Sequence, residues 1–477
     1  MKDEASEKIN NKRGKVLLIY PPSPILNRED RCQQPTEDLI VIPPLPPTDL
    51  MYLASIAELC GYEAKIKDFS QGGNFLKEIE LYQPDFLVAN IAMPTFKSDM
   101  EALAEAKNLM PALKIIVKGA PFLTYNTNVT YENPFIDYVI IGEAEMTLKD
   151  ILNGVPDSEI LGICYNDDNF QPVKNELRPY IEDLDSLPFP ARHLIDNSIY
   201  KRPDNGKVQA VIKVSRGCPY HCFFCLATPV SGANVRKRSA ENIIAEIKEC
   251  VEKYNINNFI FWSDIFNIDK EWTIDLCKKI IDSGLKITWS SNTRANTMDD
   301  EIAKWMYKAG CRLCSIGVES GSQEILNNIG KNITLDDIRN TVKILKKNKI
   351  KIYNYFVLGL PWETEKTAEE TIKFAIELDS DFVSFYTATP LPGTKYFAYA
   401  MVNKLVSGDL DFTHAYYEPV VKAHDLTKER IFELHKQAVK RFYLRPKFIF
   451  KTLLGIKSFA EFKNYVSGGI KLLVAPE

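Results

Sequence analysis

Between residues 14 and 155, short apolar runs alternate with amphipathic segments, which is the pattern of a parallel sheet covered by helices on both faces. Five runs are predicted strands: "KVLLIYPP", "AKIKDF", "DFLVANI", "KIIVKGA" and "DYVIIGEAE". Thr48 or Asp49 is expected to cap a helix that buries Leu50 and Leu53, and Gly61 to end it. We therefore predict a doubly wound domain that binds its ligand beyond the carboxyl ends of the strands.

A second alternating series covers residues 207–400 and has six candidate strands: "QAVIKVS", "NFIFWSD", "KITWSSNTR", "RLCSIGVES", "KIYNYFVLGL" and "DFVSFYTATP". Amphipathic helices such as "SAENIIAEIKECVEKYN" separate them, which predicts a partial (βα)6 barrel with its chemistry at the carboxyl ends of the strands. Residues 156–206 are polar and rich in proline, as in a linker. Residues 1–13 predict a disordered tail and residues 401–477 a helical C-terminal region, so the expected fold class is α/β.

The composition excludes several classes of function. The 477 residues carry a net charge of −4, which gives no general attraction to nucleic acid. No apolar run approaches the ~18 residues of a membrane span, and the amino terminus lacks the apolar core of a signal peptide. We therefore expect a cytoplasmic protein whose ten cysteines are thiols or metal ligands rather than disulfides. Cys311 and Cys314 are expected to pack in the core.

Three cysteines lie close together in "SRGCPYHCFFC": Cys218, Cys222 and Cys225. Their i, i+4, i+7 spacing fits a buried helix face, but Gly217 and Pro219 favour a loop. A zinc site is a second interpretation, in which His221 would be the fourth ligand, strained by its position next to Cys222. The third is a [4Fe–4S] cluster held by three thiolates, which leaves one iron without a protein ligand.

This CxxxCxxC motif follows the first strand of the predicted barrel and has an aromatic residue, Phe224, before its third cysteine. It resembles the radical S-adenosylmethionine (SAM) enzymes. The segments "GVESGSQEILNNIGKNIT", "NYFVLGLPWETEKTAEETIKFA" and "ATPLPGTKYF" look like those that follow later strands of that family. The resemblance implies that the open iron binds SAM and that the reduced cluster cleaves SAM to a 5′-deoxyadenosyl radical. It also implies a small-molecule substrate and an external electron donor of the flavodoxin or ferredoxin type.

The resemblance assigns roles to individual residues. Cys218, Cys222 and Cys225 would be the cluster ligands, and Phe224 would lie near the adenine. Glu319 would contact the ribose or amino group of SAM, and Arg294 its carboxylate. Asp264 stands where the family often places an amino contact, although the usual Gly-Gly-Glu is absent, and Gly359 would admit the adenine closely. The structural alternatives are an N-cap or surface carboxylate for Glu319 and Asp264, a salt bridge for Arg294 and a simple turn for Gly359.

The segment before the barrel resembles the cobalamin-binding domain of one subgroup, which includes anaerobic magnesium-protoporphyrin ester cyclase and the hopanoid methylases. "PYIEDLDSLPFPAR" looks like the linker of that subgroup. No histidine precedes His193, so cobalamin would be held without an imidazole on cobalt, near "IYPPSP", "IAMPTF", "KGAPF" and "IGEAE". Methylthiotransferases are less similar, because Cys32, Cys60 and Cys164 lack the context of a second cluster.

The leading hypothesis is therefore a cobalamin-dependent radical SAM enzyme that methylates, cyclises or rearranges an unactivated carbon of a natural product, cofactor or lipid. The alternatives are a radical SAM enzyme with a cobalamin-free first domain, and a non-catalytic iron–sulfur or zinc scaffold. The stretch from Lys436 to Lys463 is basic, with aromatic residues between the charges. We expect a helix packed on the barrel there, with contact to a membrane or lipidic substrate as the alternative.

Overall fold

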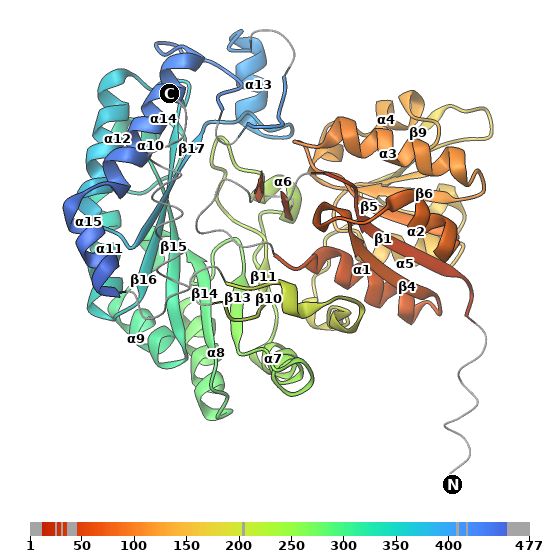
Figure 1. Ribbon diagram of the computed structural model, residues 1–477, viewed down its shortest axis with the longest axis horizontal. Coiled ribbons are helices and arrows are strands. Elements are labelled where there is room, and N and C mark those ends of the chain that lie inside the picture. The colour runs from red at the N-terminus through yellow and green to blue at the C-terminus, as the bar shows by residue number, and fades with distance from the viewer. Residues whose placement is uncertain are drawn as a thin grey trace. The chain divides into compact units, whose positions relative to one another are not determined.

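A computed structural model describes residues 12–23, 26–29, 32–35, 45–202, 206–406, 410–415 and 418–455 (Figure 1). Most of the expected disordered tail, up to residue 11, lies outside the described residues. The chain forms two compact units. The first comprises Met1–Glu37, Leu45–Asn197 and Pro229–Ser231, and the second comprises Asp38–Pro44, Ser198–Thr228 and Gly232–Glu477. No helix of the described residues is long and apolar enough to cross a membrane.

The first unit is built on a seven-stranded sheet of order β4-β1-β5-β6-β7-β8-β9. Five strands are parallel, as predicted: β1 (Lys15–Tyr20), β4 (Glu63–Asp68), β5 (Phe86–Asn90), β6 (Lys114–Lys118) and β7 (Tyr138–Ile140). Alternate residues of β1 enter different cores: Val16 and Leu18 pack with α1 (Thr48–Leu59) and α5 (Glu145–Leu152), Leu17 and Ile19 with α2 (Phe75–Tyr82) and α3 (Phe96–Leu109). A short α4 (Thr127–Glu132) precedes β7.

Three local features of this unit differ from the sequence analysis or go beyond it. Two antiparallel strands, β8 (Ile163–Asn166) and β9 (Pro172–Lys174), extend the sheet within the segment expected to be a linker. A hairpin of β2 (Leu26–Glu29) and β3 (Cys32–Pro35) follows β1. The predicted cap of α1 is wrong, because Pro47 precedes the helix without a side-chain hydrogen bond. The carboxylate of Asp49 instead accepts hydrogen bonds from Tyr20 and Asn90.

The second unit contains six parallel strands paired in chain order, as the sequence predicts (Figure 1). They are β10 (Gln209–Lys213), β13 (Asn258–Trp262), β14 (Thr288–Thr293), β15 (Cys311–Glu319), β16 (Lys351–Leu358) and β17 (Phe382–Thr387). The connecting helices are α7 (Ala240–Tyr254), α8 (Lys270–Asp282), α9 (Asp300–Lys308), α10 (Gln323–Asn328), α11 (Leu335–Lys347), α12 (Glu365–Leu378) and, after β17, α13 (Lys395–Val402). The α/β fold class is confirmed, and Cys311 and Cys314 are fully buried in the core of this unit.

Six of these helices begin at a polar residue whose side chain accepts a hydrogen bond from the first turn. The capping residues of α7, α8, α9, α11, α12 and α13 are Ser239, Asp269, Asp299, Thr334, Thr364 and Thr394. Each such cap is worth about 1 kcal/mol, because it satisfies a backbone N–H that the helix itself leaves unpaired. The caps therefore fix where each helix begins and, with it, the length of the loop that follows each strand.

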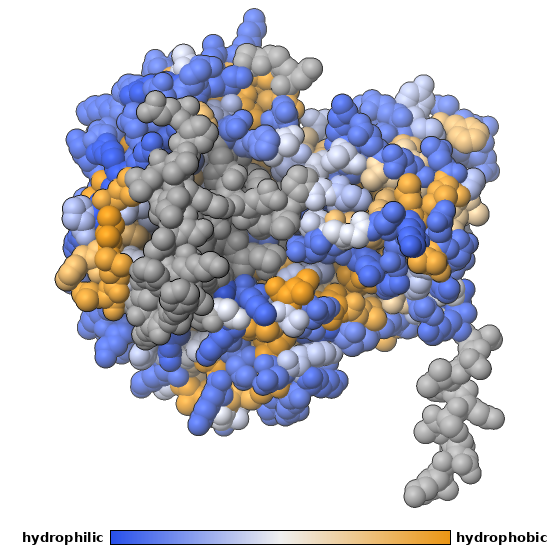
Figure 2. Space-filling view, viewed as in Figure 1, coloured by the Kyte–Doolittle hydropathy of each residue, from blue (hydrophilic) through white to orange (hydrophobic). Residues whose placement is uncertain are grey.

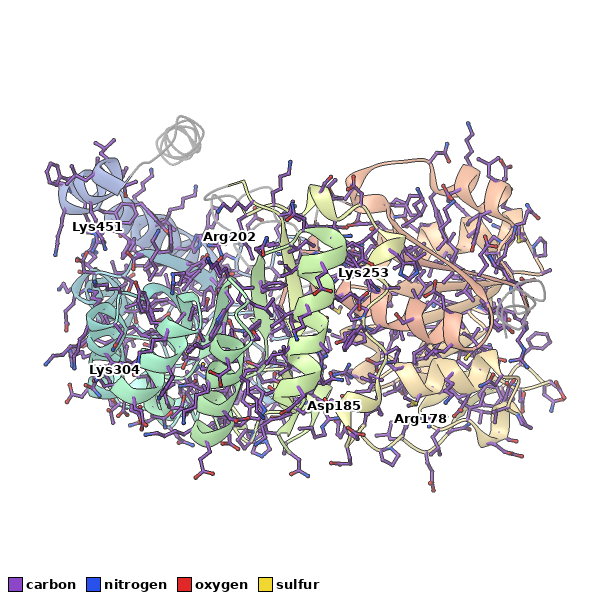
Figure 3. The ribbon with its side chains drawn as sticks, turned by 90° about the horizontal axis from the view of Figure 1, so that it is seen from below. Arg178, Asp185, Arg202, Lys253, Lys304 and Lys451 are labelled. Atoms are coloured by element: carbon purple, nitrogen blue, oxygen red, sulfur yellow. The ribbon has the colours of Figure 1, made fainter. Side chains whose placement is uncertain are left out.

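The C-terminal helices α14 (Lys428–Tyr443) and α15 (Pro446–Gly455) belong to the same unit. Phe442 is fully buried, and the Tyr443 hydroxyl donates to the backbone oxygen of Val383 at 2.5 Å. Four basic residues form ion pairs with acidic residues of the barrel: Arg441, Arg445, Lys447 and Lys451. Lys451 lies at the surface near one end of the unit (Figure 3). The preferred interpretation, a helix packed on the barrel, describes α14 well.

A buried ion pair fastens the β2–β3 hairpin to the sheet of the first unit. Both side chains are fully buried, and the Arg28 guanidinium donates to Asp99 Oδ2 at 2.6 Å and to Oδ1 at 3.0 Å. Arg28 also donates to the backbone oxygen of Asn90 at 3.1 Å, at the carboxyl end of β5. Because each charge depends on the other for its solvation, removal of one leaves the second charge buried without compensation.

We predict that Asp99→Asn destabilises the first unit by about 3 kcal/mol, because it leaves the Arg28 charge buried and unpaired. Urea denaturation followed by circular dichroism measures the loss. Glu101→Gln is the matched control, since Glu101 is exposed on the same helix, and it should change stability by less than about 0.5 kcal/mol. Equal stabilities for the two variants would show that the pair does not hold the hairpin.

Candidate functional site

The cysteine motif begins in a tight loop whose backbone geometry requires glycine at position 217. The two-residue strand β11 (Ser215–Arg216) pairs with β12 (Arg236–Lys237), and Gly217 follows with φ +101°. A Cβ atom on Gly217 would lie 2.0 Å from the backbone oxygen of Asn234. The next residue, Cys218, donates its N–H to the oxygen of Gly232 at 3.0 Å. The segment is therefore a loop, and the interpretation as a buried helix face is wrong.

Phe223, between the second and third cysteines, attaches this loop to the barrel. Its N–H donates to the oxygen of Ile329 at 2.9 Å, and its oxygen accepts from the N–H of Tyr396 at 3.0 Å. The Phe223 ring packs against Trp362, Tyr396 and Tyr399 with centroid distances of 4.9, 5.3 and 5.5 Å. No sequence pattern marks this role of Phe223, because its partners lie more than 100 residues away in the chain.

The three thiols differ in exposure. Cys218 is buried, which raises the pKa of its thiol, whereas Cys222 and Cys225 are half-buried. The N–H of Ala227 donates to Cys225 Sγ at 3.4 Å, a contact that suits a thiolate ligand. His221 is exposed. Within the described residues, no three His, Cys, Asp or Glu side chains are close enough together to hold a metal ion, so the ligand set itself stays a prediction.

Asp264 and Arg294 lie beside the cysteine loop. Asp264 Oδ2 accepts the N–H of Gly217 at 2.8 Å, so this carboxylate fixes the start of the loop rather than capping a helix. The Arg294 guanidinium stacks over the Tyr220 ring at 3.7 Å and donates to Asn296 Oδ1 at 2.9 Å. Arg294 is 4% exposed, and among the described residues it forms no ion pair. The salt-bridge alternative for Arg294 is therefore wrong, and a buried cation remains next to the motif.

Glu319 forms a buried ion pair that the sequence analysis missed. Lys331 Nζ lies 2.6 Å from Glu319 Oε1, and both side chains are about 90% buried. Glu319 has φ +68° at an irregularity where β15 meets β16, so the strand turns its last side chain inward. Burial lowers the pKa of Lys331, but the charges of Glu319 and Cys222 outweigh it and the pKa is raised. No motif marked Lys331, which stands twelve positions after Glu319 in the quoted segment.

The remaining predicted residues lie at the carboxyl end of β16 and in the loop itself. Gly359 has φ +86°, and a Cβ there would come within 2.8 Å of Ile431 on α14. Its N–H donates to Glu363 Oε2 at 2.5 Å. Phe224 is half-buried against the core of the barrel. The structure therefore brings the cysteine loop together with Asp264, Arg294, Glu319 and Lys331, and it connects Gly359 to the loop only through other residues.

At the carboxyl ends of the first sheet, polar side chains converge on Asp49. Its carboxylate accepts from Tyr20 at 2.6 Å and from Asn90 at 2.5 Å, and Lys118 Nζ lies 3.2 Å away. These residues end β1, β5 and β6, three of the strands whose loops were expected to surround cobalamin. Gly142, after β7, has open space where a Cβ would stand. Asn90 Oδ1 is buried without a hydrogen-bond partner among the described residues. This edge therefore combines open backbone at Gly142 with an unpaired polar atom, which fits a bound cofactor.

Comparison with known proteins identifies the family. Residues 212–375 match the model of the radical SAM superfamily. The chain is 34% identical over 453 residues to an uncharacterized methyltransferase of Pyrococcus horikoshii, covering 92% of this chain and 94% of the relative. The chain belongs to the radical SAM superfamily. It is also 25% identical to the anaerobic magnesium-protoporphyrin IX monomethyl ester cyclase of Rubrivivax gelatinosus, over 85% of this chain and 75% of the relative.

Solved structures of radical SAM enzymes share the fold. The cobalamin-dependent enzyme OxsB, solved with aqua-cobalamin and SAM, superposes with a TM-score of 0.75 at 17% identity, covering 97% of this chain and 72% of that chain. The methyltransferase TsrM from Kitasatospora setae gives a TM-score of 0.63 at 18% identity, covering 80% and 73%. The radical SAM superfamily uses a [4Fe–4S] cluster and SAM, so the chain is an enzyme, and the non-catalytic scaffold hypothesis is wrong.

Proposed function

We propose that this radical SAM enzyme is cobalamin-dependent and that it methylates, or cyclises or rearranges, an unactivated carbon of a natural product, cofactor or lipid. The observation that supports this most is the cysteine loop beside two buried cations, Arg294 and Lys331. Three thiols on one loop are suited to a cluster with an open iron. A cation without a carboxylate partner is suited to an anionic ligand such as the carboxylate of SAM.

Each residue has a defined task in this proposal. Cys218, Cys222 and Cys225 hold the cluster. Arg294 binds the carboxylate of SAM. Its guanidinium is already oriented by Tyr220 and Asn296, so little side-chain entropy is lost when the ligand binds. Glu319 accepts from the amino or ribose group, since Lys331 uses only one of its two oxygens. When bound, the cluster and SAM supply the radical chemistry, and the protein orients them and excludes side reactions.

Asp264, Phe224 and Gly359 have more indirect tasks. Asp264 holds the Gly217 N–H and thereby the loop, which replaces the amino contact implied by the resemblance. Phe224 and Gly359 shape the adenine site. The electron comes from an external flavodoxin or ferredoxin type of donor, which can approach because Cys222 and Cys225 are partly exposed beside exposed His221. A reducing cytoplasm suits such a cluster.

Cobalamin is assigned to the first unit. The relatives named methyltransferase and cyclase match across both units of this chain, and the open backbone at Gly142 lies where such a cofactor would approach. A radical SAM enzyme with a cobalamin-free first unit is the second candidate, because the Asp49 carboxylate already has Tyr20, Asn90 and Lys118 as partners without a ligand.

We predict that anaerobic reconstitution gives a brown [4Fe–4S] protein that binds SAM, and that Cys222→Ala abolishes the cluster. Arg294→Ala should keep the cluster and weaken SAM binding about 10- to 100-fold, the worth of a charge-assisted hydrogen-bonded contact. Iron and sulfide analysis with equilibrium binding of labelled SAM measures both effects.

Two matched variants control this experiment. Cys250→Ala removes a fully buried thiol of α7, and Arg312→Ala removes an exposed arginine that stacks on Tyr307 at 4.4 Å. Both should retain the cluster and the SAM affinity of the wild type. A colourless zinc protein would contradict the cluster, and loss of the cluster in Arg294→Ala would contradict the role of Arg294.

We predict that the holoprotein binds cobalamin with no protein nitrogen on cobalt, because residues 1–192 contain no histidine. Electron paramagnetic resonance of the Co(II) state detects an axial nitrogen by its hyperfine splitting. Cobalamin bound without that splitting is the expected result. Splitting from a protein nitrogen would contradict this prediction, and an absence of binding would favour the second candidate.

A lipid contact is proposed for α15. Ile449, Phe450, Leu453 and Leu454 are 44–73% exposed on this helix, and Figure 2 shows the resulting apolar patch over α15. Four of the expected basic residues are paired with barrel carboxylates, so the apolar face rather than charge would drive the contact. Lys457, Phe459 and Lys463, which completed the expected basic-aromatic stretch, lie outside the described residues.

We therefore predict cosedimentation with neutral as well as anionic vesicles, with little dependence on salt. Phe450→Asp with Leu454→Asp should abolish it, because charges on the inserting face must be desolvated. Leu59→Asp, at a residue 72% exposed in the first unit, is the control and should bind like the wild type. Recovery of the wild type in every supernatant would leave α15 without a lipid contact.

A further inference from the structure

A carboxyl group is buried in the turn that follows β16, within the segment "PWETEKT". The Glu363 side chain is fully buried. Its Oε2 accepts the N–H of Gly359 at 2.5 Å, and its Oε1 is buried with no hydrogen-bond partner among the described residues. An ionised carboxylate in this position would have one hydrogen bond and no counter-charge, which is a costly arrangement.

The surroundings of Glu363 favour its neutral form. Burial raises the pKa of Glu363 to about 8, opposed only by the hydrogen bond from Gly359. On α14, Ile431 lies next to Gly359 and is apolar, and Arg430 is engaged with exposed Glu365 at 2.5 Å. On α13, the fully buried Tyr396 hydroxyl has no hydrogen-bond partner in the part of the chain that the structure describes. Burial raises the pKa of Tyr396, and the carboxyl of Glu363 raises it further.

The turn that Glu363 closes is connected to the cysteine loop on two sides. Trp362, the neighbour of Glu363, packs on the Phe223 ring at 4.9 Å. Tyr396 donates its N–H to the oxygen of Phe223 at 3.0 Å. Trp362 and Tyr396 therefore share Phe223 as a partner, and movement of the 359–363 turn would displace the residue that lies between Cys222 and Cys225.

We propose that neutral Glu363 is a positioning residue that holds the Gly359 turn and, through Trp362 and Tyr396, the cysteine loop in the arrangement that binds SAM, and that ionisation of Glu363 releases this arrangement. The inference rests on the proposed function, because it concerns the affinity of the same site for SAM. Once ionised, the carboxylate is stable only if water reaches Oε1, and the packed turn has to open for that.

The test is the equilibrium dissociation constant for labelled SAM, measured anaerobically on the cluster-loaded full chain at pH 7 and pH 9. If only the neutral form binds, the competent fraction falls about tenfold between these pH values, and the apparent dissociation constant rises by the same factor. Glu363→Gln keeps a neutral group of the same size, so it should lack this dependence. The ratio of wild type to Glu363→Gln cancels the titration of the amino group of SAM itself.

Two variants control the assignment to Glu363. Glu365→Gln changes an exposed carboxyl two residues away, and it should retain the tenfold effect. Tyr396→Phe removes the unpartnered hydroxyl but keeps the ring on Phe223 and the backbone hydrogen bond, so it should retain the effect as well. The same tenfold loss in Glu363→Gln as in the wild type would overturn the proposal.

Thermal stability of the metal-free chain gives a second measurement that does not involve SAM. A carboxyl whose pKa is higher in the folded than in the unfolded state takes up a proton on folding, so its contribution to stability falls as pH rises from about 5 to 8 and is constant above 8. The wild type should therefore lose stability relative to Glu363→Gln across that window. A pH-independent difference between the two proteins would overturn the neutral state of Glu363. Absence of SAM binding at every pH, with this stability window present, would instead overturn the proposed function on which the inference rests.

Discussion

The arrangement of the site depends on Phe223, the residue between the last two cysteines of the motif. Its backbone is held at both ends, by Ile329 and by Tyr396, while its ring is enclosed by three aromatic side chains. The constraint allows three cysteines on one short loop to be presented at the carboxyl ends of the barrel strands, without a second segment supplying a fourth thiol.

The charged side chains around this loop differ in whether they already have a hydrogen-bond or ion-pair partner. Asp264 accepts a hydrogen bond from the Gly217 N–H, and Glu319 and Lys331 form an ion pair with each other. Arg294 is oriented by Tyr220 and Asn296 but has no carboxylate among the described residues. A buried cation is costly unless it is compensated. In the proposed function the carboxylate of SAM would offset this cost, so the same feature that lowers stability would favour binding of a carboxylate.

The sequence predicted the parts of the structure that depend on local pattern. The six barrel strands, the parallel strands of the first sheet and the loop character around Gly217 all follow from periodicity and from glycine and proline. The remaining features depend on contacts between residues that are far apart in the sequence. Asp49, one of the two residues expected to cap α1, instead accepts hydrogen bonds from Tyr20 and Asn90. Lys331 and Glu363 appear as ordinary polar residues in the sequence. Lys331 is buried through its pairing with Glu319 at the end of β15, and Glu363 lies in the turn after β16, near Tyr396 of α13. The strands β8 and β9 were missed because their segment is polar and rich in proline.

In the proposed function, the cysteine loop holds a cluster with one iron open to SAM, next to Arg294. Electron paramagnetic resonance of the reduced, cluster-loaded protein tests it most directly, with and without SAM labelled with ¹⁵N at its amino group. We expect SAM to change the spectrum and its nitrogen nucleus to couple to the cluster spin. An unchanged spectrum at a SAM concentration that saturates binding would contradict binding to the open iron, because SAM would then bind elsewhere.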